Sequence, residues 1–175
     1  DTMANYNVTG AGGTTGHPSN GRTPYLVENT IDISAVASDA GTSSGDILRC
    51  IDVPAETLVL CAGVEVLTAL SSSATIDIGW ASATSGNPSA DGDRWIDGDT
   101  NATGYGTLRT VTDNGTTGLP FGNAVLFPAA ETIDATIGGA DSSAGKIRVW
   151  ALMCDVSGID ETDRNTATQH DTTVS

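Results

Sequence analysis

The sequence predicts an all-β protein, an antiparallel β-sandwich of the jelly-roll type with an extended arm at each end. Apolar and polar residues alternate in several runs, which is the period of a strand with one buried face. The 21 glycines, with many threonines and serines, favour strands and turns over helices. No stretch keeps helical periodicity beyond a turn or two. A chain of 175 residues suits one compact domain with tails.

The longest strand-like stretch covers residues 57–81, and we expect the sheet to be organised around it. Ile76, Ile78 and Trp80 alternate with polar residues or glycine, whereas residues 57–70 are apolar on much of both faces. The polar tripeptide at 71–73 separates these two runs. A short polar connection between two such runs is typical of an antiparallel hairpin. Because the two runs are long and apolar, we expect this hairpin in the middle of a sheet and not at its edge.

Further strand-like runs lie on both sides of this stretch. The run that precedes it ends before Pro54, which cannot donate a backbone hydrogen bond to a ladder. Residues 82–122 are irregular, apart from two short candidate strands, and so large an excursion indicates a contact function. The total is about eight strands, typical of a sandwich or jelly roll. The other predicted strands are 25–37, 46–53, 94–96, 107–112, 124–128, 131–138 and 146–156.

The two ends of the chain read as arms around a domain at residues 25–157. Residues 1–24 and 158–175 are rich in Gly, Thr, Ser and Asn and have little to bury. Such segments cannot repay their ordering entropy alone. We expect both arms to be disordered in the isolated protein and to order only against a partner.

Charge and motif content exclude several function classes. The chain carries 22 acidic and 7 basic residues, a net charge of −15, so it should bind neither nucleic acid nor an anionic membrane. The only histidines, His17 and His170, lie in the predicted arms, and no hydrolase, phosphate-binding or zinc-protease motif is present. Asp77 and Asp134 could form a glycosidase-like pair, but solvent-facing acids explain them better. We therefore predict no enzymatic activity and no cofactor.

One loop offers oxygen ligands for calcium. Its candidates are Asp91, Asp93, Asp97, Asp99 and Asn101. Their spacing is not that of an EF-hand, and Asp-Gly pairs are also ordinary turn formers. We therefore expect no metal to be required for folding, with calcium as the alternative.

The three cysteines all fall inside predicted strands. Cys50, Cys61 and Cys154 are expected to pack as small free hydrophobes, and a disulfide between Cys50 and Cys61 is the alternative.

Several of these segments, in this order, resemble small virion structural proteins of tailed phages, including marine and cyanobacterial phages. The similarity lies in Val53-Pro54-Ala55-Glu56-Thr57, the ATIDIG strand, an Asp-Gly loop at Asp91 and the GKIRVWAL strand. It covers about residues 45–156, and Glu56 stands where the family pattern has glycine. The resemblance implies a β-sandwich that assembles on a capsid or a tail.

We therefore expect a capsid decoration or cement protein on the outside of a phage head. Its partners would be the major capsid protein and copies of itself, because surplus apolar residues on strands need a second cover. That the copies form a homotrimer is what the resemblance implies. The alternative is a tail-fibre or carbohydrate- or receptor-binding module that uses residues 82–122. The predicted contact residues are Val59, Trp95, Tyr105, Phe121, Trp150, Leu152, Arg22 and Arg164.

Overall fold

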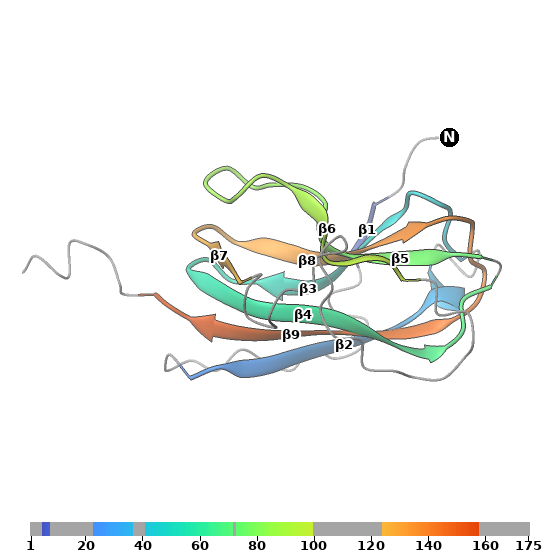
Figure 1. Cartoon of the computed structure of the whole chain (residues 1–175), viewed down its shortest axis with the longest axis horizontal. Helices are drawn as coiled ribbons and strands as arrows, with labels where there is room; N and C mark the ends of the chain where they lie inside the picture. Colours follow the sequence, from blue (N-terminus) through green and yellow to red (C-terminus); the bar gives the residue numbers. More distant parts are fainter. Residues whose placement is uncertain (1–4, 8–22, 37–40, 72, 100–123, 158–175) are drawn as a thin grey trace, which may run out of the picture.

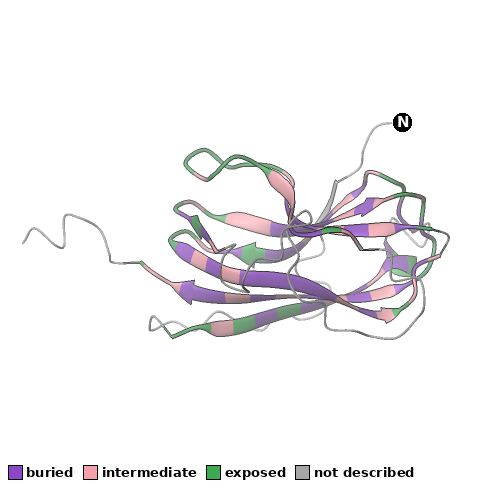
Figure 2. Ribbon diagram, in the orientation of Figure 1, coloured by how far each residue is buried: buried purple, intermediate pink, exposed green. Residues whose placement is uncertain are grey.

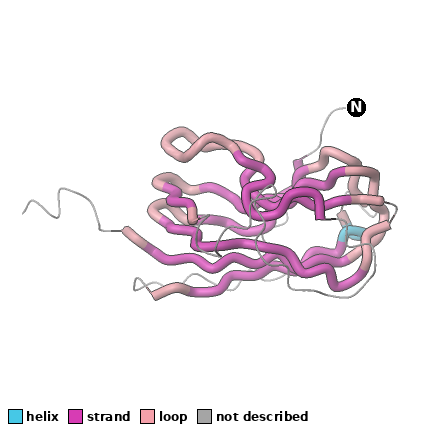
Figure 3. The backbone as a smooth tube through the Cα atoms, viewed as in Figure 1, coloured by secondary structure: helices cyan, strands magenta, loops and turns pink. Residues whose placement is uncertain are grey.

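The computed structural model describes residues 5–7, 23–36, 41–71, 73–99 and 124–157. Within this part the chain forms nine strands and one short 3-10 helix, Ile33–Ala35, which confirms the all-β prediction (Figures 1 and 3). No helix among the described residues is long and apolar enough to cross a membrane. The strands are β1 (Asn5–Asn7), β2 (Tyr25–Asp32), β3 (Ile47–Val53), β4 (Thr57–Thr68), β5 (Thr75–Trp80), β6 (Asp91–Asp99), β7 (Val125–Phe127), β8 (Glu131–Gly138) and β9 (Lys146–Asp155).

The strands form two stacked sheets with jelly-roll connectivity. One sheet has the order β1-β3-β8-β5-β6 and the other β2-β9-β4-β7 (Figure 1). The antiparallel pairs are nested: β5 pairs with β6, β4 with β7, β3 with β8 and β2 with β9. The chain is thus one long hairpin, with β5 and β6 at its tip, rolled up so that successive pairs fall in alternate sheets. This nesting confirms the predicted jelly roll.

The predicted hairpin between residues 57–70 and 74–81 is wrong. β4 and β5 lie in different sheets, although each has a strand on both sides, as expected of central strands. The connection between them is held by another loop: Ser71 N donates to Ala144 O at 3.2 Å, and Ser143 N donates to the Ser71 hydroxyl at 2.8 Å. Period-two alternation is the same in a hairpin as in two strands of opposite sheets, so the sequence pattern did not distinguish them.

A bulge in β4 reverses which residues face the core. The register against β9 shifts between Val59 and Cys61, so Val59 faces inward before the shift and Ala62 and Val64 face inward after it. A bulge inserts one residue and switches the side-chain parity. Val59 is 0% exposed, so the prediction that it contacts a partner is wrong for this structure.

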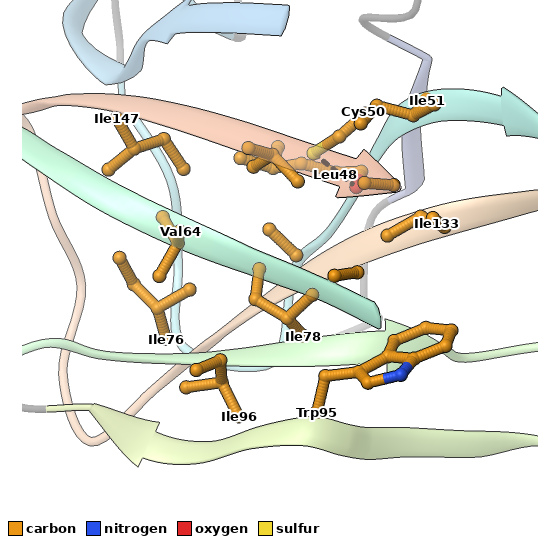
Figure 4. Packing of buried hydrophobic residues seen from close by; sticks show 14 of the residues in the cluster. Leu48, Cys50, Ile51, Val64, Ile76, Ile78, Trp95, Ile96, Ile133 and Ile147 are labelled. Atoms are coloured by element: carbon orange, nitrogen blue, oxygen red, sulfur yellow. Dashed lines mark hydrogen bonds between the residues drawn. The ribbon is translucent and has the colours of Figure 1, made fainter. Parts of the chain in front are cut away.

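β6 contributes two adjacent residues to the core. Trp95 and Ile96 are both buried at a register irregularity, where Ile78 pairs with Ile96 but Trp80 pairs with Asp91. Figure 4 shows Ile96 near Ile76 of β5, and the side chains of Trp95 and Ile96 both belong to the buried hydrophobic cluster. The rings of Trp95 and Trp80 lie 5.5 Å apart. Trp95 is therefore a core residue and not the surface residue that the sequence predicted.

The edge of the β3 sheet holds part of the predicted N-terminal arm. β1 pairs in parallel with β3, from Asn5 opposite Ile47 to Asn7 opposite Arg49. These three residues thus lie against their own chain, and the expected disorder of the arms in the isolated protein stays a prediction. The other residues of both predicted arms lie outside the described part of the chain.

The three cysteines are buried and none of them is in a disulfide, as the main reading of the sequence predicted. Burial raises the pKa of the Cys50 thiol far above its usual value, and raises that of Cys61 as well. Such thiols stay protonated and act as small apolar side chains.

Candidate interaction surface

The outer face of the β2-β9-β4-β7 sheet carries apolar residues over one half. Cross-strand register places Leu26, Leu152 and Cys61 in one row, and Cys154, Leu58 and Leu126 in the next. Leu26 and Leu126 are 56% and 46% exposed, the two large apolar residues most open to solvent in the described chain. Figure 2 shows exposed and half-buried positions interspersed along this sheet. We define the outer apolar patch as Leu26, Leu58, Leu126, Trp150 and Leu152.

The other half of the same face is polar, and its basic side chains form ion pairs with acids of the same chain. Lys146 Nζ lies 3.3 Å from the Asp32 carboxylate on the next strand, and Arg148 forms a hydrogen-bonded ion pair with Glu65. A hydrogen bond from Ser34, and then one from Lys146, holds the pKa of Asp32 below its usual value. Each base on this half therefore has an acidic partner within its own chain, and the patch ends at this row.

Acidic residues flank the patch. Glu28 is exposed on the same face of β2 as Leu26 and lies opposite Trp150. Glu56 is exposed in the turn before β4, and Asp155 ends β9 opposite Thr57. This register gives Asp155 the inward parity of Thr57, and after burial its charge raises the pKa of Tyr25 at the same end of the sheet. The nearest described base, Arg148, is already paired with Glu65.

The outer face of the opposite sheet is covered by its own loop. The buried Asp134 carboxylate accepts hydrogen bonds from Ala81 N at 2.9 Å and from the Thr132 hydroxyl at 2.7 Å. Glu131 accepts from Thr84 N at 2.7 Å and from Asn87 Nδ2 at 3.1 Å. These contacts fasten residues 81–90 against β8.

Asp77 and Asp134, the pair weighed as a glycosidase-like site, have structural partners on this covered face. Asp77 accepts from Gly98 N at 2.5 Å. Burial raises the pKa of both carboxyls, while their backbone hydrogen bonds oppose that rise. The nearby hollow is a polar pocket of about 230 Å³, which Arg49, Thr84 and Glu131 help to line. These contacts give both carboxylates a role in holding strands and loops together.

The predicted site residues fall into three groups. Trp150 and Leu152 lie in the outer apolar patch, half-buried, whereas Val59 and Trp95 lie in the core. The calcium candidates from Asp91 to Asp99 lie along strand β6 and not on a loop, and the described side chains contain no group of three acids placed to hold a metal. The candidates outside the described residues are Arg22, Asn101, Tyr105, Phe121 and Arg164.

Sequence reasoning missed Leu26 and Leu126, the two most exposed members of the patch. The alternation of side chains along a strand could have identified Leu26. It points to the same face of β2 as the polar residues Glu28, Thr30 and Asp32. Leu126 lies in a strand of only three residues, too short for alternation to show a face.

Together these features define a small jelly-roll protein with one apolar half-face rimmed by acids. No family model and no curated protein matches the sequence. The fold is similar to a chain in the capsid of Ralstonia phage GP4, with a TM-score of 0.61, 14% identity and coverage of 88% of this chain and 98% of that one. It is also similar to a chain in the cyanophage Pam1 capsid asymmetric unit, with a TM-score of 0.50, 14% identity and coverage of 79% and 91%.

Proposed function

We propose that this chain is a structural protein of a phage virion, located on the outside of the head, where it decorates and stabilises the capsid. The observation that carries the proposal is the fold match to chains of two phage capsids, which spans nearly the whole of each matched chain. A protein made of little more than this jelly roll therefore occurs among capsid components. The motifs that resemble small virion proteins of tailed phages point the same way.

The surface properties support a role in assembly. An apolar patch on a sheet face is the kind of surface that soluble proteins use for contacts with other proteins. A net charge of −15 suits contact with a basic protein surface and opposes contact with packaged nucleic acid. The proposed partner is the major capsid protein. Closed symmetric assembly is usual for identical chains, so we also retain the homotrimer as a prediction.

Particles made with and without this protein test the proposed function. The protein should be found in purified virions by mass spectrometry, and density for a jelly roll should lie on the outside of the head by electron microscopy. Heads that lack it should open at lower temperature and milder osmotic shock. Equal resistance of both kinds of particle would remove the stabilising role, and absence from the virion would remove the proposal.

Sedimentation of the isolated protein tests the homotrimer separately. A trimer at micromolar concentration is the expected result, and a monomer at high micromolar concentration would contradict it. The alternative function, a carbohydrate- or receptor-binding module, stays a prediction because most of residues 82–122 lie outside the described part of the chain. Binding on a glycan array would support it.

A further inference from the structure

We propose that the outer apolar patch is the surface by which this protein docks on the capsid, on an apolar area with a basic rim, and that it is not an interface between copies of this chain. The inference rests on the proposed function and adds to it the docking face and the chemistry of the partner surface. Three observations carry it: the composition of the patch, the acids around it and the neutrality of the adjoining half-face.

The patch is continuous across all four strands of its sheet. Leu26 on the edge strand β2 lies opposite Leu152 of β9, and Leu126 on the other edge strand, β7, lies opposite Leu58 of β4. Its most exposed members therefore stand at the two sides of the sheet, with half-buried leucines between them. Contact with an apolar surface would remove all of them from water together.

The flanking charges select the partner. Glu28 lies beside the patch on the outer face and Glu56 lies in the turn next to it, and the only described base adjoining the patch, Arg148, is engaged by Glu65. Two copies that met through this patch would bring the same acids together in a chain that already carries −15. Like charges opposed across an interface disfavour that pairing. A partner with lysines or arginines around an apolar area would instead complement this rim.

The polar half of the face sets the limit of the docking area. Because Lys146 and Arg148 are neutralised by Asp32 and Glu65, this half offers no net charge to a partner. Loss of one of these ion pairs should therefore have less effect on docking than a change at Glu28. The contrast between the two halves can be measured directly.

The experiment measures binding of the full-length protein to heads that lack it, by co-sedimentation over a range of protein concentrations. The double variant Leu26→Ser/Leu126→Ser should weaken binding about tenfold or more, because two exposed leucines lose apolar contact. The matched control is Leu26→Met/Leu126→Met, which keeps both side chains apolar and should bind within about twofold of the wild type. Equal thermal melting of all three proteins establishes that the substitutions leave the fold intact.

A second pair of variants tests the rim. Glu28→Gln should weaken binding and reduce its dependence on salt, because one attraction to a basic rim is lost. Asp141→Asn, at an exposed acid in the turn at the other end of β9, makes the same charge change away from the patch and should bind like the wild type. Equal effects of Glu28→Gln and Asp141→Asn would overturn the complementary rim.

The outcomes separate this inference from the proposed function. If the wild-type protein does not bind the heads, the proposed function fails. If the wild type binds and both double variants bind equally well, the function stands and the docking face is wrong. If Leu26→Ser/Leu126→Ser instead dissociates an oligomer of the free protein into monomers, the patch lies between copies and the inference is overturned. Weakened binding with unchanged sedimentation supports it.

Discussion

Asn29 of β2 donates a hydrogen bond from its side-chain Nδ2 to the backbone carbonyl of Cys50 in β3, at 2.8 Å. The two residues belong to opposite sheets, so this bond links the two layers along one side of the sandwich. Cys50 lies at the register shift of β3 against β8 and has no partner residue in that ladder. The buried amide of Asn29 therefore satisfies a carbonyl at a bulge.

Removal of this bond should destabilise the fold. Asn29→Ala leaves the Cys50 carbonyl buried without its donor, and we expect the free energy of unfolding to fall by about 1–3 kcal/mol. Chemical denaturation measures the change, with Thr30→Ala on the outward side of the same strand as the control. Asn29→Asp keeps the shape of the side chain but replaces the donor with a buried charge at neutral pH. It should therefore lower the free energy of unfolding by more than Asn29→Ala does. A loss no larger than that of Thr30→Ala would contradict the assigned role.

Strand positions could be predicted from the sequence much better than strand partners. Pro54 ended β3 as expected, and residues 131–138 form β8 with the predicted bounds. The pairing of β4 with β5 was wrong because alternation reports which side chains are buried and does not report which strand lies next to them. In this fold β2 pairs with β9, which is the last described strand in the sequence. No local sequence pattern indicates a partner so far along the chain.

The candidate surface was predicted only in part, for a similar reason. Parity placed Trp150 and Leu152 outside correctly, but the bulge in β4 turned Val59 inward and the irregular register of β6 buried Trp95. One extra residue in a strand reverses every later side chain, and the chain gives little local sign of it. Glu56 is the exception, since the resemblance to a glycine-containing turn marked it as unusual.

Glu56 occupies a backbone conformation that favours glycine. Its φ is +56°, and among the described residues it is the only non-glycine residue with a positive φ. The left-handed region strains residues that have a Cβ. Glu56→Gly should therefore raise the free energy of unfolding by about 1 kcal/mol, the relief of strain being larger than the added entropy of the unfolded chain. Glu56→Ala removes the same charge and keeps the Cβ, so a glycine variant no more stable than the alanine variant would disprove this explanation.

Gly79 of β5 lies where the backbone at the start of β6 approaches so closely that there is no room for a Cβ. A Cβ at this position would collide with the backbone of Asp91 and Gly92, reaching 2.5 Å from the Gly92 carbonyl carbon. Backbone cannot move aside as a side chain can, so Gly79→Ala should lower stability by about 2 kcal/mol or more. Gly92→Ala is the matched control, because its Cβ would meet its nearest neighbours only at 4.0 Å. Thermal melts that gave both variants the same stability would show that the crossing is not tightly packed.

The buried Asp134 predicts an unusual dependence of stability on pH. Burial raises the pKa of this carboxyl above the ordinary value of 3.8, and its hydrogen bonds from Ala81 and Thr132 offset only part of that rise. Between these two pKa values the native state holds more protons than the unfolded state. The contribution of Asp134 to stability is therefore fully present below the unfolded pKa and is lost as the pH rises through the folded pKa.

Asp134→Asn should remove this dependence, because an amide does not titrate, while its oxygen can still accept the hydrogen bond from Ala81. Relative to the wild type, the variant should be more stable at pH 7 than at pH 4, as measured by chemical denaturation at both pH values. Asp52→Asn, on an exposed side chain of β3, controls for the loss of one negative charge. The opposite sign, with the variant relatively weaker at pH 7, would mean that the ionised carboxylate stabilises the loop at 81–90 by more than its burial costs.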